Sequence, residues 1–93
     1  MLVLYPEPVD RAAFDEYYRA AHLPLCRSIP GISDIRFSLG LEGPYYGVFE
    51  ASFESADAFR SAMASPEGRA TAADVANYAT GGATVIDYPV ESA

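Results

Sequence analysis

The stretch DIRFSLGLEGPYYGVFEASF, residues 34–53, decides the fold. Its first part, residues 34–39, alternates strictly between polar and apolar side chains, as in a β-strand with one face on a core. The glycines and proline of residues 40–44 predict a turn, and a second extended run follows over residues 45–53. Together these segments predict a β-hairpin.

In the second run of this hairpin, both alternating sets of side chains are largely apolar. The alternation assigns one face to Tyr45, Phe49, Ala51 and Phe53 and the other face to Tyr46 and Val48. Two apolar faces indicate a sheet that is covered on both sides. One layer of helices cannot cover both.

On the N-terminal side of the hairpin, the pattern predicts a strand and then a helix. Residues 2–5 are an apolar run that ends at two prolines, which cannot donate to a β-ladder. Asp10 is the expected N-cap of a helix that continues to Pro30-Gly31. Within it, apolar and aromatic side chains recur at helical spacing, at Phe14, Tyr17/Tyr18, Ala21 and Leu25.

On the C-terminal side, two short helices and a last strand are expected. Ser55 caps an amphipathic helix, and Ser65-Pro66-Glu67 begins a second helix that runs to about Ala79. Gly81-Gly82 then breaks the chain. Residues 83–88 form the last strand, which Pro89 ends.

The order strand, helix, strand, strand, helix, strand predicts an α+β fold of the ferredoxin-like, split βαβ type, as a single domain over residues 1–93. It contains a four-stranded antiparallel sheet with both helical segments on one face. The other face is expected to be open and apolar, so two copies would pack sheet against sheet as a homodimer, forming a dimeric α+β barrel. The composition agrees, because 51% hydrophobic residues, with seven tyrosines and five phenylalanines, exceed what one small core hides.

Charge and cysteine content exclude several classes of protein. Thirteen acidic residues outnumber six basic ones, the net charge is −7, and no Lys/Arg cluster is present, which argues against nucleic acid and membrane surfaces as partners. All six basic residues are arginine, so no lysine can form a Schiff base. A single cysteine, Cys26, and the absence of a signal-peptide pattern or a long apolar stretch favour a cytoplasmic location.

No common cofactor motif occurs in the chain. One histidine and one cysteine cannot form a zinc or copper ligand set, and only a carboxylate site for a hard cation stays open. A G-x-S-x-G elbow, a P-loop and a G-x-G-x-x-G loop are all missing. We therefore expect neither a metal nor a bound cofactor.

His22 is the only histidine and the first candidate for acid or base chemistry, because its unperturbed pKa lies near neutrality. The alternative is a histidine that caps a helix end and bonds a backbone carbonyl. Tyr18 lies four residues before it, on the same helical face. Cys26 lies one turn beyond, although an isolated buried thiol is the commoner outcome for such a cysteine.

Tyrosines and an aspartate complete the set of candidate ligand-binding residues. A phenol beside the imidazole could stabilise a developing oxyanion while the imidazole moves a proton. The candidates for such a pocket are Tyr5, Tyr18, Tyr46 and Tyr88, with Asp74 and Tyr78 from one face of the second helical region. Asp74 could orient His22 or bind ligand. The alternatives are tyrosines that fill the core and an aspartate that only complements a helix dipole. Glu50 lies in a central strand, on a face that could form the dimer interface, where its carboxylate could pair with Arg36 of the neighbouring strand.

The chain resembles the EthD family over nearly its whole length. The resemblance is carried by Val3-Leu4-Tyr5-Pro6, Asp10, Phe14, Tyr17-Tyr18, His22-Leu23-Pro24-Leu25 and Pro30-Gly31, and by Ser65-Pro66-Glu67-Gly68, Asp74-Val75-Ala76-Asn77-Tyr78-Ala79 and Gly81-Gly82. It implies a dimeric α+β barrel and a possible active-site role for His22, with Asp74 and Tyr78 as further candidates. The founding members are accessory proteins of ether degradation, and relatives in the barrel superfamily include cofactor-free monooxygenases, polyketide cyclases, muconolactone isomerases and haem-degrading enzymes.

Two functions follow as hypotheses, and the sequence leaves open whether the protein is an enzyme. The first is binding of a small apolar or aromatic metabolite, with His22 catalysing cofactor-free proton transfer, isomerisation, cyclisation or oxygenation. The alternative is a non-catalytic module that binds a hydrophobic ligand or assists a degradative or biosynthetic pathway. A haem-binding or haem-degrading protein is a third hypothesis, with His22 as the only good axial ligand, but the acidic composition offers little to attract haem propionates.

Overall fold

The computed structural model describes residues 1–93 and contains a four-stranded antiparallel sheet with the strand order β2-β3-β1-β4. The strands are β1 (Leu2–Tyr5), β2 (Ser33–Leu39), β3 (Gly47–Ser52) and β4 (Thr84–Ile86). Strand β3 lies between β1 and β2, the two strands that the first helical segment connects. This topology confirms the predicted α+β, split βαβ fold and its central hairpin.

The first helical segment is continuous but not regular. It consists of α1 (Arg11–Tyr17), a π-helical turn η1 (Tyr18–His22) and α2 (Leu23–Arg27). The Asp10 side chain accepts a hydrogen bond from the Ala13 N–H, which confirms the predicted cap.

The π turn was not expected from the sequence. The backbone N–H of Leu23 donates to the carbonyl of Tyr18, five residues earlier. The next residue, Pro24, has no N–H, and in a regular α-helix its ring would clash with a carbonyl four residues back. The wider turn before Pro24 therefore forms where an α-helix would be interrupted in any case.

The second helical region consists of α3 (Ala56–Ala64), α4 (Pro66–Asp74) and a 3₁₀ turn η2 (Val75–Asn77). Ser55 and Ser65 cap α3 and α4, as predicted: their hydroxyls accept from the N–H groups three residues on. The corner between the two helices is tight. A Cβ at Gly68 would lie 2.1 Å from the carbonyl oxygen of Ala62, so only glycine fits there.

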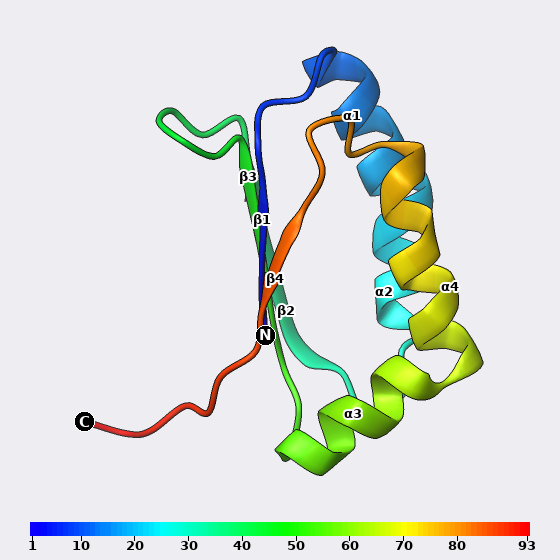
Figure 1. The fold of residues 1–93 in the computed structure, drawn as a ribbon, viewed down its shortest axis with the longest axis vertical. Helices are drawn as coiled ribbons and strands as arrows, with labels where there is room; N and C mark the ends of the chain where they lie inside the picture. Colours follow the sequence, from blue (N-terminus) through cyan, green and yellow to red (C-terminus); the bar gives the residue numbers. More distant parts are fainter.

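The helices cover one face of the sheet and leave the other uncovered (Figure 1). Helices α1, α2 and α4 lie against one face, α3 lies across one end, and residues 87–93 extend away on the uncovered side. The strand pairing places Leu2, Leu4, Val48 and Ile86 on that uncovered face. Arg36 and Glu50 lie opposite each other on the same face, with 4.0 Å between their charged groups, as predicted. The open face is therefore apolar at its centre but polar toward β2, rather than apolar throughout.

Aromatic side chains dominate the core between the sheet and the helices. The largest fully buried side chains are Tyr5, Phe14, Tyr18, Tyr46 and Phe49. Their rings meet mostly edge to face, for example Tyr5 on Phe14 at 5.3 Å between ring centroids. The hydroxyl groups of the buried tyrosines must find partners inside this core, which makes its polar contacts informative.

The assignment of Tyr46 to the face opposite Phe49 was wrong. Strand β3 begins only at Gly47, and Tyr46 belongs to the loop before it. The Tyr46 N–H donates to the Tyr5 carbonyl at 2.8 Å, and its side chain is buried with a hydrogen bond to Asp15 on α1. Strict alternation does not apply to a residue outside the strand.

None of the helices combines the length and the hydropathy that a bilayer-spanning segment needs.

Candidate active site

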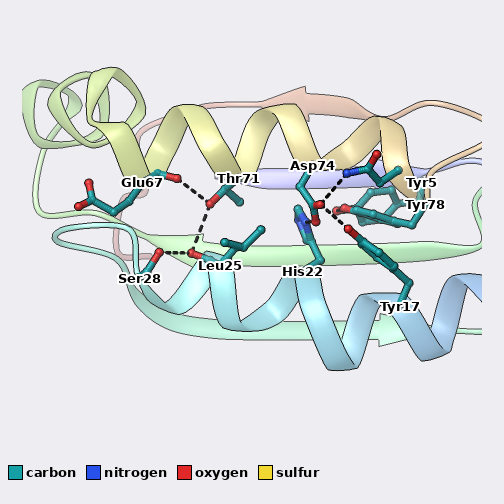
Figure 2. A network of polar contacts seen from close by, with 10 residues as sticks. Tyr5, Tyr17, His22, Leu25, Ser28, Glu67, Thr71, Asp74 and Tyr78 are labelled. Atoms are coloured by element: carbon teal, nitrogen blue, oxygen red, sulfur yellow. Dashed lines mark hydrogen bonds and ion pairs between the residues drawn. The ribbon is translucent and has the colours of Figure 1, made fainter.

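A hydrogen-bonded pair, His22 and Asp74, lies between the two helical regions (Figure 2). The Nδ1 atom of His22, at the end of η1, is 2.9 Å from Oδ2 of Asp74, at the end of α4. His22 is 3% and Asp74 8% exposed. The structure thus brings the two residues together, which is one of the arrangements that the sequence left open for Asp74.

Two further side chains hold the Asp74 carboxylate in place. The Tyr17 hydroxyl donates to Oδ1 at 2.6 Å (Figure 2). The Asn77 amide donates to the same oxygen at 2.9 Å. Burial alone would raise the pKa of Asp74, but the hydrogen bonds from Tyr17, Asn77 and His22 together hold that pKa below its usual value. Asp74 is therefore ionised at neutral pH and accepts on both oxygens.

His22 is a neutral imidazole in this setting. Burial lowers its pKa, and the neighbouring Asp74 carboxylate opposes that effect only in part. Because an ionised carboxylate can only accept, the bond to Asp74 assigns the imidazole proton to Nδ1. The Nε2 atom makes no hydrogen bond within the chain and is not among the fully enclosed polar atoms. Its lone pair is thus free to accept a proton.

His22 lines a small cavity between the sheet and the helices. The cavity measures about 90 Å³, which is room for about three water molecules or the head of a small ligand. Its walls are mostly apolar, with Val3 and Phe49 from the sheet and Val75 from η2. Val85 of β4 pairs with Val3 and faces the same side, yet it is 58% exposed. The cavity therefore opens toward solvent beside β4.

Three of the candidate tyrosines gather at this cavity. The hydroxyls of Tyr5 and Tyr78 are 2.8 Å apart, and the Tyr78 ring lies 4.6 Å from the His22 ring. The Tyr18 ring stacks on His22 at 5.4 Å. The Tyr18 hydroxyl is enclosed and has no hydrogen-bond partner. Tyr5 forms part of the cavity wall. Tyr18 and Tyr78 do not line the cavity, but their rings pack against His22.

The other two candidate tyrosines lie elsewhere. The Tyr46 hydroxyl donates to Asp15, and the Arg11 guanidinium covers its ring at 4.9 Å. Tyr88 is 45% exposed in the C-terminal segment. It borders a separate surface depression of about 430 Å³ together with Phe53 and other residues near the β3–α3 connection. Neither tyrosine shares the cavity of His22.

Tyr17 and Asn77 were not identified from the sequence as site residues. Asn77 follows Asp74 by three residues, a spacing that places both on one helical face and was available as a signal. Nothing in the spacing links Tyr17 to Asp74, since they are 57 residues apart. Cys26 also lines the cavity, but burial raises its thiol pKa to about 11, so the thiol stays protonated at neutral pH.

No group of three or more His, Cys, Asp or Glu side chains in the structure could hold a metal ion.

Comparison with known proteins relates most of the chain to one family. The model of the EthD domain matches residues 6–82. An uncharacterised 11.0 kDa protein in the thcB–thcC intergenic region of Rhodococcus erythropolis is 43% identical over 91 residues, covering 90% of this chain and 86% of the relative.

Solved structures agree with this relationship. The crystal structure of an EthD family protein from Bacillus halodurans superposes with a TM-score of 0.84 at 31% identity, covering 91% of this chain and 90% of that one. A dimeric ferredoxin-like protein of unknown function from Thermobifida fusca shares the fold, with a TM-score of 0.72 at 22% identity over 96% of this chain and 87% of its own.

Proposed function

The chain belongs to the EthD family, and on that premise we propose that it binds a small apolar or aromatic metabolite in the cavity beside β4 and moves a proton on it with His22. The observation that carries this proposal is the His22–Asp74 pair at the wall of an otherwise apolar cavity. Proton transfer is the step common to isomerisation, cyclisation and cofactor-free oxygenation, the reactions expected from the sequence.

The state of His22 suits a general base. A neutral imidazole with its proton on Nδ1 presents a lone pair at Nε2, and a lowered pKa keeps that form populated at neutral pH. When the imidazole takes up a proton, the Asp74 carboxylate stabilises the charge through the bond to Nδ1. Tyr17 and Asn77 hold Asp74 in place, so the imidazole keeps its orientation.

We also infer that the protein is a homodimer. The apolar centre of the uncovered sheet face, formed by Leu2, Leu4, Val48 and Ile86, supports this assembly, as do neighbours described as dimeric. A Leu4→Glu variant should then be monomeric, while a substitution of the exposed Val9, away from this face, should not change the assembly. Light scattering after size-exclusion chromatography distinguishes the two masses, and a wild-type monomer would contradict the inference.

A non-catalytic ligand-binding module is the second candidate function. The cavity's small volume and apolar lining favour it, because such a site can bind a ligand without chemistry. In this case His22 would serve only to position Asp74 and close the cavity.

Ligand binding and turnover by His22 variants separate the two functions. Wild type, His22→Ala and His22→Gln are screened by thermal shift against aromatic, lactone and polyketide-like compounds, and every hit is checked for product. Gln at position 22 keeps a donor for Asp74 but has no basic nitrogen. Conversion by wild type and binding alone by both variants supports the enzyme. Equal binding by all three with no conversion establishes the binding module instead.

A further inference from the structure

Tyr5 is the only buried tyrosine of the cluster near His22 that lines the cavity. It projects from β1, while Tyr18 comes from η1 and Tyr78 follows η2. The Tyr5 and Tyr78 hydroxyls are 2.8 Å apart although the residues are 73 positions apart in the chain. Figure 2 shows this pair beside His22. One phenol and one imidazole therefore both contribute to the cavity wall.

The position of Tyr78 decides which hydroxyl donates in this pair. Each phenol can donate one hydrogen bond and can also accept. Tyr78 is only 5% exposed, and its hydroxyl has no other partner within the chain. If Tyr5 donated, the Tyr78 proton would be buried without an acceptor, which is unfavourable. If Tyr78 donates, the Tyr5 oxygen accepts that bond and the Tyr5 proton is left for another acceptor.

The pKa directions agree with this arrangement. Burial raises the pKa of Tyr5, and the hydrogen bond with the Tyr78 hydroxyl opposes that rise. Burial also raises the pKa values of Tyr18 and Tyr78, and at these two residues the neighbouring Tyr5 adds to the rise. Only at Tyr5 does a neighbouring hydroxyl counteract the rise in pKa, which agrees with Tyr78 as the donor and Tyr5 as the acceptor of the bond between them.

We propose that the Tyr5 hydroxyl binds the carbonyl oxygen of the substrate, and that the substrates are carbonyl compounds with a removable proton on the neighbouring carbon, such as ketones and lactones with an apolar body. This inference rests on the proposed proton transfer by His22. Nε2 of His22 takes the proton from carbon, the C–H electron pair forms the new C=C bond, and the carbonyl π pair moves to oxygen. The enolate oxygen accepts from Tyr5, and the imidazolium returns the proton to carbon.

The shape of the cavity fits this class of compound. The cavity, of about 90 Å³, has room for the carbonyl group of a ligand. The apolar part of the ligand would then extend past the exposed Val85 toward solvent. The other lining side chains are apolar apart from Thr71 and the protonated Cys26, so no lining side chain carries a charge that would pair with a charged group on the ligand. One phenol can bind one acceptor oxygen, and one base can remove one proton. The two residues therefore suit a carbonyl oxygen next to an acidic C–H.

Binding of 4-nitrophenol tests the role of Tyr5 without catalysis, because its phenolate resembles an enolate and differs from the phenol in absorbance. Wild type should bind the phenolate form, and Tyr5→Phe should weaken this binding at least tenfold. Tyr45→Phe is the matched control, which loses a phenol outside the cavity. The double variant Tyr5→Phe/Tyr78→Phe removes both hydroxyls of the pair and leaves no buried orphan if the single variant folds poorly. Phenolate binding by both Tyr5 variants at the wild-type level would overturn the inference.

Exchange of the α protons of 2-tetralone in deuterium oxide, followed by NMR, tests the chemistry. Wild type should accelerate the exchange, His22→Gln should abolish the acceleration, and Tyr5→Phe should lower it at least tenfold. Exchange that depends on His22 but not on Tyr5 would overturn the inference and leave the proposed function in place. Tyr5-dependent phenolate binding without His22-dependent exchange would support the oxyanion site and overturn proton transfer. Neither binding nor exchange would overturn both.

Discussion

Replacement of Asp74 by asparagine tests the polar network at its centre. The Oδ1 atom of Asp74 accepts from Tyr17 at 2.6 Å and from Asn77 at 2.9 Å, while Oδ2 accepts from Nδ1 of His22 at 2.9 Å. Asparagine keeps the size but not the charge, and it has one acceptor oxygen in place of two. The oxygen of the new asparagine must occupy the position of Oδ1, next to Asn77. If its side-chain amide were flipped, its NH₂ group would face the NH₂ group of Asn77.

The expected cost follows from these three bonds. A hydrogen bond to a charged group contributes about 1.5–3 kcal/mol and one between neutral groups about 0.5–1.5 kcal/mol. The bonds from Tyr17 and Asn77 therefore weaken by about 1 kcal/mol each. In the bond to His22, the side chain at position 74 becomes the donor instead of the acceptor. We expect Asp74→Asn to lower the free energy of unfolding by about 2–3 kcal/mol. For a domain of this size, that lowers Tm by about 10–20 °C.

The tautomer of His22 gives a second readout, which a merely destabilised protein would not show. In the variant the new NH₂ group donates to Nδ1, so the imidazole proton should move to Nε2. His22 is the only histidine, so its ¹⁵N NMR signals need no further assignment. Its pKa should also fall below the wild-type value, since Asp74 raises it. An unchanged tautomer together with a Tm within about 2 °C of wild type would refute the reasoning.

Three further predictions concern stability. Wild type should lose stability as the pH falls from about 6.5 through the lowered pKa of His22, because the unfolded chain takes up the proton first; this slope should be absent in His22→Gln, as read from urea midpoints. Tyr18→Phe removes an enclosed hydroxyl without a partner and should leave the free energy of unfolding unchanged or raise it by about 1 kcal/mol; a clear loss in denaturant titration would reveal a missed partner. Gly68→Ala places a Cβ 2.1 Å from the Ala62 carbonyl and should destabilise by about 3 kcal/mol or more in calorimetry, and a wild-type Tm would contradict that close approach.

The fold was predictable because local signals and the global arrangement agree. The alternation over residues 34–39, the glycine-rich turn, and the caps Asp10, Ser55 and Ser65 each specify one element boundary, and the structure contains all of them. Each signal acts over a few residues and needs no knowledge of distant contacts.

The sequence identified several residues of the site, but not the distances and contacts between them. His22 and Asp74 stood out by residue type, but the bond between them joins positions 52 apart, and periodicity carries no information at that distance. Tyr17 was missed for the same reason. Tyr46 and Tyr88 were included as candidates because a tyrosine in or near a strand looks the same from sequence whether its hydroxyl reaches the cavity or a surface carboxylate.

The π-helical turn was also beyond sequence reasoning, because the aromatic spacing before it satisfies a regular helix. Only the position of Pro24 hints at an interruption, and a proline is compatible with several kinds of helix ending.

The same turn makes the site depend on the length of the helix, since a π turn is an α-helix with one residue inserted. Removal of one residue within η1, such as Ala20, would take away the extra residue of the π turn and rotate α1 relative to α2. Each residue of an α-helix advances it by about 100°, so Tyr17 and His22 could no longer both face Asp74. A single codon gained or lost could thus create or abolish the pairing without altering any side chain that takes part in it. Sequence alignments of relatives should be read with a one-residue gap allowed at this position.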